Sequence, residues 1–435
     1  MKKIVLGFIL LFGGSQAKYN VVDFVLENGL RVVCIEKKTS PITFFSIWYR
    51  CGSKCDAISK SGAAHYLEHM AFVANKMEFS NFLEDVGADK NAFTSINAIC
   101  FHELVPKENI ETVFIHESRR MISLDIDDDA FLSEKGAILE ERSTRVDNDP
   151  NGASQESLLS NIFNREAGGI GIIGWKHEIQ SITKKDLYKF HRKWFAPNNA
   201  VVVLSGDFDL NQIKKMAEKY FGKIPPKKLP KRVKKTPSGP CLKEIKYGSP
   251  KNGSASVAEY IYRTPFSSKE SLKKTIALEV ALKVMNRPAS FVKKILKDAL
   301  NHATEVAFSY VDRLFQYDIV VLEIASPSID DLGDAENAWR YLKNKLAYAG
   351  VLKSELDAVK RQELVSLAYK KDDIIEMSNY FGWLLINGYS VDEIQSIDDM
   401  IQEVSEKECN DLLREIFSQD PIAIFRILPK SYDRE

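Results

Sequence analysis

Residues 65–69 read His65-Tyr66-Leu67-Glu68-His69, and this is the most informative stretch of the sequence. Apolar residues recur around it with helical spacing, which predicts a helix over residues 61–74. On a helix, His65 and His69 stand one turn apart on one face, with about 6 Å of axial rise between them, so both imidazoles can reach one metal ion. Glu68 directly precedes the second histidine, so its carboxylate would point beside that ion.

A catalytic zinc site has three protein ligands and a water molecule, so a third ligand has to come from another segment. The best candidates lie in residues 133–142, whose sequence is SEKGAILEER. Glu134 and Glu141 are seven residues apart and share a helix face, whereas Glu140 does not. Periodicity alone does not choose between Glu140 and Glu141. The alternative is that the motif holds two ordinary histidines and a helical salt bridge from Glu68.

The composition bounds the class of protein. The chain has 435 residues, of which 45% are hydrophobic and 28% are charged. These values are typical of a folded protein with a large core, and the length suggests two domains or more. The 60 basic residues balance the 60 acidic ones. This balance removes the electrostatic case for nucleic-acid binding by the chain as a whole, and we expect no nucleic-acid partner.

The first seventeen residues resemble an export signal. Lys2 and Lys3 precede an apolar run at residues 4–12, and small residues follow up to Ala17. The run is too short to span a bilayer, which needs roughly 20 residues. We therefore expect a signal peptide over residues 1–17 and a soluble, exported protein, periplasmic or extracellular, with no membrane span after signal removal. The alternatives are an uncleaved membrane anchor and a buried first strand.

The rest of the chain divides near its middle. Residues 223–240 hold five prolines and seven basic residues, which predicts an extended linker between an N-terminal domain at 18–222 and a C-terminal domain at 241–435. The pentapeptide EIQSI occurs at 178–182 and again at 393–397. In each half it precedes a helical stretch and then a strand-like run, which indicates an internal duplication.

Each half mixes strands with helices. β-Branched and aromatic content predicts strands over 21–24, 30–35, 44–49, 201–204 and 422–428, with a hairpin turn at Asn28-Gly29. Apolar spacing predicts helices over 110–124, 131–147, 154–163, 186–195 and 406–417, besides the helix at 61–74. Strands grouped ahead of helices favour an α+β fold, in which a sheet is covered by helices.

Together with the downstream LEER segment, the HxxEH motif resembles the pitrilysin-type zinc metallopeptidases, which carry the inverted form of the zincin motif. Asn91-Ala92-Phe93-Thr94 resembles the family's NAxT strand, and Phe195-Ala196-Pro197-Asn198-Asn199 followed by residues 201–207 resembles its YxPxN and GD signature. The length is similar to that of the short branch, typified by mitochondrial processing peptidase and its bacterial relatives. The resemblance implies two similar domains, each an antiparallel-rich sheet covered by helices, that enclose a chamber with a partner half.

The resemblance also implies roles for particular residues. Its zinc ligands would be His65, His69 and Glu141, holding one Zn2+ per chain. Glu68 would be the general base, and Glu134 falls where the family has a supporting carboxylate that orients the ligand set. The implied activity is that of a zinc-dependent endopeptidase, because a metal-bound water and a carboxylate base hydrolyse amides.

Asn91 and Ala92 would bind the substrate. A peptide lying extended along the strand at 91–96 would add a strand to an exposed edge, so that backbone hydrogen bonds supply affinity with little demand on sequence. We therefore expect the substrates to be peptides or unfolded segments.

The chain departs from the family pattern in its second half. Active members usually carry an arginine and a tyrosine seven residues apart, and the corresponding positions here hold Leu296 and Ala303. This half-site favours a heterodimer in which a homologous subunit supplies the missing Arg/Tyr pair. The alternative is a non-hydrolytic binding or assembly subunit that retains the metal.

Residues 169–174 match the GxGxxG pattern of dinucleotide-binding folds. Such a motif needs a strand before it and a helix that opens at its last glycine. A predicted helix precedes it here, so a glycine-rich loop is the better interpretation.

Overall fold

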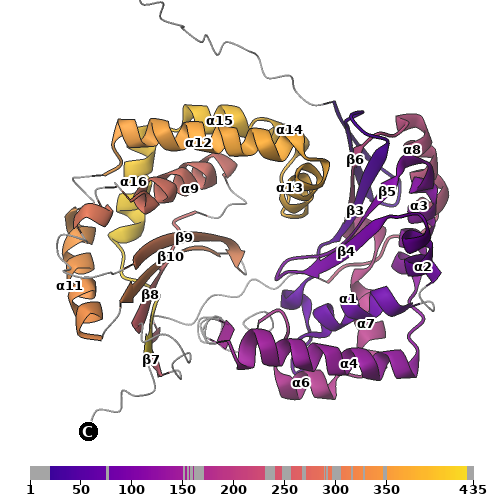
Figure 1. The fold of residues 1–435 in the computed structure, drawn as a ribbon, viewed down its shortest axis with the longest axis horizontal. Coiled ribbons are helices and arrows are strands. Elements are labelled where there is room, and N and C mark those ends of the chain that lie inside the picture. Colours follow the sequence, from indigo (N-terminus) through magenta and orange to yellow (C-terminus); the bar gives the residue numbers. More distant parts are fainter. Residues whose placement is uncertain are drawn as a thin grey trace, which may run out of the picture.

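The computed structural model describes residues 20–74, 78–149, 152–153, 156, 160, 171–230, 241–246, 256–266, 271–288, 290, 292–295, 305–314, 317–326, 329–345 and 350–428. Its elements form two α+β halves, the N-terminal half on the right of Figure 1 and the C-terminal half on the left. The predicted signal peptide, most of the predicted helix at 154–163 and residues 231–240 of the predicted linker lie outside the described residues. Among the described helices, none is long and apolar enough to cross a membrane.

The first half is built on a six-stranded sheet with the order β1-β2-β6-β3-β5-β4. Its strands are β1 (Val21–Val25), β2 (Arg31–Glu36), β3 (Ile42–Tyr49), β4 (Asp89–Thr94), β5 (Ile99–Pro106) and β6 (Ala200–Gly206). Neighbours run antiparallel except β2 and β6, which are parallel. The predicted turn between β1 and β2 is confirmed, because Gly29 has φ +87° and its N–H bonds to the carbonyl of Leu26 at 2.8 Å.

Helices cover one face of this sheet. They are α1 (Ala63–Val73), α2 (Glu78–Asp85), α3 (Ile110–Ile122), α4 (Asp128–Arg142), α6 (Lys176–Ser181), α7 (Lys184–Trp194) and α8 (Leu210–Met216). The predicted helix at 131–147 begins three residues early, where Asp127 accepts from the N–H groups of Asp129 and Ala130, and it ends in a π-helical turn at Ser143–Asp147. Side chains of β2 alternate between the faces. Val32 and Cys34 join the core under α1, and Val33 and Ile35 join a second core on the opposite face.

The second half repeats this plan. Its five-stranded sheet has the order β7-β11-β8-β10-β9. The strands are β7 (Cys241–Lys246), β8 (Ser256–Arg263), β9 (Glu305–Leu314), β10 (Tyr317–Ser326) and β11 (Ala423–Leu428). The parallel pair β7·β11 stands where β2·β6 stands in the first sheet, and the remaining neighbours are antiparallel in both. This match, together with the EIQSI repeat that begins in α6 and in α14 (Val391–Gln395), supports a duplicated architecture.

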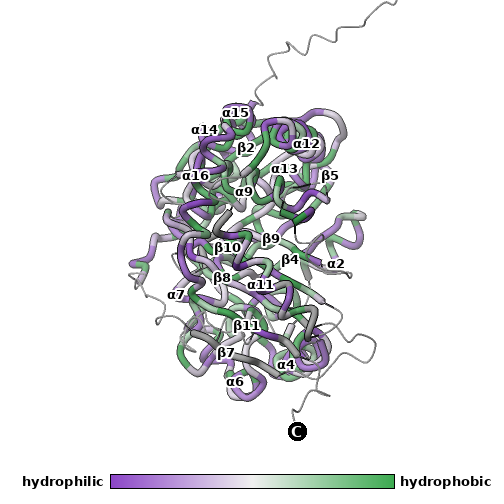
Figure 2. Tube along the Cα trace, turned by 90° about the vertical axis from the view of Figure 1, so that its left-hand side faces the viewer, coloured by the Kyte–Doolittle hydropathy of each residue, from purple (hydrophilic) through white to green (hydrophobic). Residues whose placement is uncertain are grey.

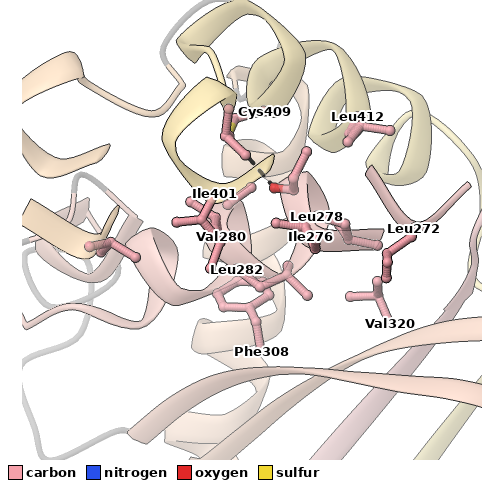
Figure 3. Close-up of a cluster of buried hydrophobic side chains, with 14 of the residues drawn as sticks. Leu272, Ile276, Leu278, Val280, Leu282, Phe308, Val320, Ile401, Cys409 and Leu412 are labelled. Atoms are coloured by element: carbon pink, nitrogen blue, oxygen red, sulfur yellow. Dashed lines mark hydrogen bonds between the residues drawn. The ribbon is translucent and has the colours of Figure 1, made fainter. Parts of the chain in front are cut away.

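The helices of the second half are α9 (Leu272–Asn286), α11 (Ile329–Lys345), α12 (Lys353–Asp372), α13 (Ile374–Ile386), α14 (Val391–Gln395), α15 (Ile397–Glu403) and α16 (Glu406–Phe417). Figure 3 shows the core that α9, α15 and α16 form above the sheet, where side chains from these helices meet Phe308 of β9 and Val320 of β10. In Figure 2 the strand β10 is mostly hydrophobic and the short outer helix α6 is mostly hydrophilic, as expected for a buried strand and a surface helix.

Helix α13 joins the two halves. Although it belongs to the second half, it packs on β3 and β6 of the first sheet (Figure 1), on the face opposite α1. A Cβ added at Gly382 would overlap the ring of Trp48, so only glycine permits this approach. Ser205 Oγ donates to the carbonyl of Ile374 at 2.5 Å, and the guanidinium of Arg50 donates to the last carbonyls of α13. The first sheet is therefore covered on its second face by the second half.

Candidate metal centre

Helix α1 begins at a buried cap. Asp56 accepts hydrogen bonds from the N–H groups of Gly62 and Ala64, each at 2.8 Å. Gly62 has φ +85°, a conformation that favours glycine. Burial raises the pKa of Asp56 to about 8, although the backbone N–H bonds oppose the shift. The cap fixes where α1 starts, and thereby which residues face α4.

The structure brings His65, His69 and Glu141 together. Glu141 Oε2 lies 3.5 Å from Nε2 of His65 and 3.4 Å from Nε2 of His69. The two imidazole centroids are 4.7 Å apart, with their planes at 74°. One potential ligand atom from each of the three residues lies within 4.8 Å of the others. Glu140, which helical periodicity left as an alternative, is exposed.

These donor atoms fit a zinc ion. Ligand atoms at the corners of a tetrahedron with bonds of about 2.1 Å are about 3.4 Å apart, which matches the separations from Glu141 to both histidines. A metal ion binds the neutral form of imidazole. Burial is the main cause that lowers the pKa of His65 to about 4, and the neighbouring His69 adds to this shift. Burial alone would also lower the pKa of His69, but its contacts with Glu141 and Glu134 outweigh burial and raise it.

Glu134 holds His69 from the other side. Its Oε2 lies 3.0 Å from Nδ1 of His69. A carboxylate on Nδ1 fixes the tautomer in which Nδ1 carries the proton and Nε2 keeps a free lone pair for a metal, and Nε2 is the atom that faces Glu141. The structure thus places Glu134 where a supporting carboxylate was predicted.

Glu68 lies beside the histidines and is 8% exposed. Burial raises the pKa of its carboxyl group, while a hydrogen bond from Thr94 opposes that shift. Thr94 Oγ1 donates to Glu68 Oε2 at 2.8 Å. The role of Thr94 was missed in the sequence, where it appeared only as the last residue of the NAxT-like stretch.

Arg145 is a second residue that the sequence did not single out. It lies in the π-helical turn after α4, and its guanidinium donates to Glu141 Oε1 at 2.8 Å. The spacing of four residues from Glu141 was the only available signal. Because Arg145 binds Oε1, Oε2 is left to face the histidines.

The predicted substrate strand is the edge strand β4. In the described sheet, β4 pairs with β5 on one side, with Ala92 opposite Phe101 and Asn91 opposite His102. Asn91 is exposed and Ala92 is half-buried. The strand ends at Thr94 rather than at residue 96, because the chain turns back there and the N–H of Ser95 bonds to the carbonyl of Ala98. Leu296 and Ala303, at the positions of the missing Arg/Tyr pair, lie outside the described residues.

Two matches to protein families cover most of the chain. Residues 31–174 match Insulinase (Peptidase family M16), and residues 181–363 match the Peptidase M16 inactive domain. The chain belongs to peptidase family M16, and the resemblance predicted from HxxEH and LEER is confirmed.

Individual relatives agree with this assignment. Zinc protease PqqE from Helicobacter pylori is 27% identical over 410 residues, which are 89% of this chain and 88% of that protein. Mitochondrial-processing peptidase subunit beta from Blastocladiella emersonii is 26% identical over 204 residues, 46% of this chain and 45% of that protein. The crystal structure of a protease from Helicobacter pylori has the same fold, with a TM-score of 0.80 at 20% identity, and the match covers 94% of this chain and 100% of that one.

Proposed function

We propose that the protein is a zinc-dependent endopeptidase that hydrolyses peptides or unfolded segments, with His65, His69 and Glu141 as the ligands of one Zn2+. The observation that carries this proposal is the convergence of three donor atoms within 4.8 Å, with the buried Glu68 beside them. The name of the relative PqqE, a zinc protease, supports the choice of metal and of reaction class.

The residues of the chain divide the work of amide hydrolysis. A bound zinc ion would lower the pKa of its water molecule and polarise the scissile carbonyl. Glu68 takes a proton on its carboxylate from the attacking water and passes it to the leaving nitrogen. Thr94 holds one oxygen of Glu68, which leaves the other free for this transfer. Glu134 keeps the His69 ring in the orientation in which Nε2 faces Glu141, where it would serve as a ligand.

A peptide substrate would bind along β4. Among the strands that the structure describes, β4 has one unpaired edge that offers backbone N–H and C=O groups, and such edges bind extended peptides by strand addition. Asn91 and Ala92 lie on this strand, which also carries Thr94, so a peptide paired with them runs past the base. This mode of binding selects extended chains and explains why unfolded segments are the expected substrates.

The protein would act as the metal-bearing subunit of a heterodimer. The second half lacks the RxxxxxxY pattern, and residues 181–363 match a domain described as inactive. The likeness to a peptidase chain named subunit beta supports pairing with a homologous subunit that carries the Arg/Tyr pair. The N-terminal pattern of two lysines, an apolar run and Ala17 supports export to the periplasm or the extracellular space.

Two measurements test this proposal. Glu68→Gln should retain about one Zn2+ per chain in elemental analysis and lose hydrolysis of a fluorogenic unstructured peptide, whereas Glu140→Gln, a change at an exposed glutamate, should keep both. Activity should require a homologous chain co-purified from the native host. Turnover by the single chain would contradict the heterodimer, and zinc-loaded pairs without hydrolysis would favour the non-hydrolytic assembly subunit.

A further inference from the structure

Residues 173–178, which we call the bridging segment, lie against the start of α1. The N–H of Trp175 donates to Ser61 Oγ at 2.9 Å, and the N–H of Ser61 donates to Glu178 Oε2 at 2.7 Å. This segment contains the end of the GxGxxG stretch at residues 169–174, which we interpret as a glycine-rich loop and not as a nucleotide-binding motif. Its hydrogen bonds attach it to the residue that precedes Gly62, the N-cap residue of α1, whose N–H donates to Asp56.

The two backbones touch without intervening side chains. A Cβ added at Gly62 would overlap the carbonyl oxygen of Ile173, and a Cβ added at Gly174 would overlap the carbonyl group of Ser61. Both glycines also have positive φ, +85° and +89°. Any displacement of the bridging segment is therefore transmitted directly to the start of α1, because there is no soft side chain between them to absorb it.

The same segment is bound to the end of α4 by Arg142. The Arg142 side chain is buried, and its guanidinium forms a bidentate pair with Glu156 at 2.7 and 2.8 Å. It also donates to the carbonyl of Gly174, contacts Asp147 at 3.2 Å, and lies 5.6 Å from the ring centroid of Trp175. Both terminal nitrogens of the guanidinium are thus engaged, and such a planar, bidentate arginine fixes its own backbone far more rigidly than a solvated arginine does.

Arg142 directly follows Glu141, and His65 is the third residue of α1. The bridging segment thus spans the ends of the two helices that bring Glu141 and His65 to 3.5 Å. A shift of α4 at this end would open the separation between the carboxylate and both imidazoles.

We propose that Arg142 is a positioning residue that holds Glu141 at ligand distance from the two histidines by anchoring α4 to the bridging segment. This inference rests on the proposed zinc site. Arg142 touches neither substrate nor metal in this role, so it acts through Glu141. Partners behind metal ligands commonly change metal affinity about 10- to 100-fold when they are removed.

The test compares Arg142→Met, Arg142→Lys and Glu156→Gln with a matched control, Lys135→Met. Lys135 also lies on α4 and donates to carbonyls near α6, those of Gln180 and Ile182, but it does so about two turns from Glu141. The readouts are the dissociation constant of Zn2+ in competition with a chromophoric chelator, and the visible absorption spectrum of the Co2+-substituted protein. Thermal unfolding of the metal-free proteins reports stability separately.

Arg142→Met and Glu156→Gln should weaken Zn2+ binding about tenfold or more and reduce the intensity of the Co2+ bands. Arg142→Lys should give an intermediate value, since it keeps the charge and loses the bidentate geometry. Lys135→Met should lower the unfolding temperature and leave the Zn2+ affinity within about twofold. Should Arg142→Met fail to fold, Arg142→Lys and Glu156→Gln decide the question.

Wild-type Zn2+ affinity and Co2+ spectrum in the folded Arg142 and Glu156 variants would overturn the inference. His65→Ala separates this outcome from failure of the zinc site itself. If His65→Ala leaves Zn2+ binding unchanged, the proposed site is wrong; if it abolishes binding while the Arg142 and Glu156 variants bind normally, only the positioning role is wrong.

Discussion

The hydroxyl of Thr94 donates a 2.8 Å hydrogen bond to Glu68 Oε2 and so connects the edge strand β4 to the carboxylate beside the two histidines. Because a hydroxyl stabilises the ionised carboxylate, this contact opposes the rise in the pKa of Glu68 that burial causes. The strand on which we expect substrate to bind is thereby linked to the group that we expect to accept the proton.

Thr94→Val should lower kcat/KM about tenfold, the equivalent of one hydrogen bond of about 1.4 kcal/mol to a charged group. The variant loses the contact that lowers the pKa of Glu68, so the pKa rises and the base becomes protonated at a higher pH. The acid limb of the pH–rate profile should therefore move toward neutrality. Thr94→Ser should restore the wild-type profile, and an unchanged acid limb in the valine variant would show that the contact does not tune the base.

Removal of the metal should destabilise the protein as well as inactivate it. A ligand that binds only the folded state at 100 times its dissociation constant adds about 2.7 kcal/mol to the free energy of unfolding. Denaturant titrations with saturating Zn2+ and with a chelator should differ by about this amount or more in the wild type. The difference should vanish in His69→Ala, and its persistence there would indicate that zinc binds elsewhere.

The buried cap of α1 should contribute strongly to stability. Asp56→Ala leaves the N–H groups of Gly62 and Ala64 without their acceptor, and should cost about 2 kcal/mol in the free energy of unfolding. Asp127→Ala removes the exposed cap of α4 and should cost about 1 kcal/mol in the same denaturant experiment. Equal costs would mean that burial adds nothing at Asp56.

The contact between α13 and the first sheet can be tested by adding a single methyl group at Gly382. Gly382→Ala places a Cβ against the ring of Trp48 and should destabilise the protein by about 1–3 kcal/mol. Gly333→Ala, in α11, is the matched control, because a Cβ there meets nothing within 4 Å. It should be neutral or stabilise by up to about 1 kcal/mol. Calorimetric unfolding of both variants measures the difference, and equal unfolding temperatures would contradict the packing.

Local patterns predicted the elements well where apolar spacing was strong. The helix at 406–417 has the predicted bounds, and the first three strands begin and end within two residues of their predictions. The choice between Glu140 and Glu141 required the family resemblance, because it depends on the rotation of α4 about its axis. That rotation is set by tertiary contacts such as the bond from Tyr66 to the carbonyl of Phe131.

What the sequence could not predict are contacts between residues far apart in the chain. Thr94 contacts Glu68 only because β4 runs beneath α1, and nothing in the sequence around either residue indicates this contact. The position of α13 was equally hidden, because its apolar pattern shows that it is buried without showing against which half. The ion pair of Arg142 and Glu156 was not predicted for the same reason. In the sequence each is an ordinary charged residue, and only the fold shows that both are buried and paired.

The placement of α13 has a consequence for biosynthesis. Ser46 and Ser378, whose hydroxyls lie 3.4 Å apart, are separated by 332 positions. During translation, the face of the first sheet that carries Trp48 is therefore synthesised long before α13, the helix that covers it. Every nascent or prematurely terminated polypeptide that lacks α13 exposes this apolar face. Such intermediates need a holding chaperone or rapid completion, and fragments that stop before residue 374 should aggregate instead of yielding a working N-terminal half.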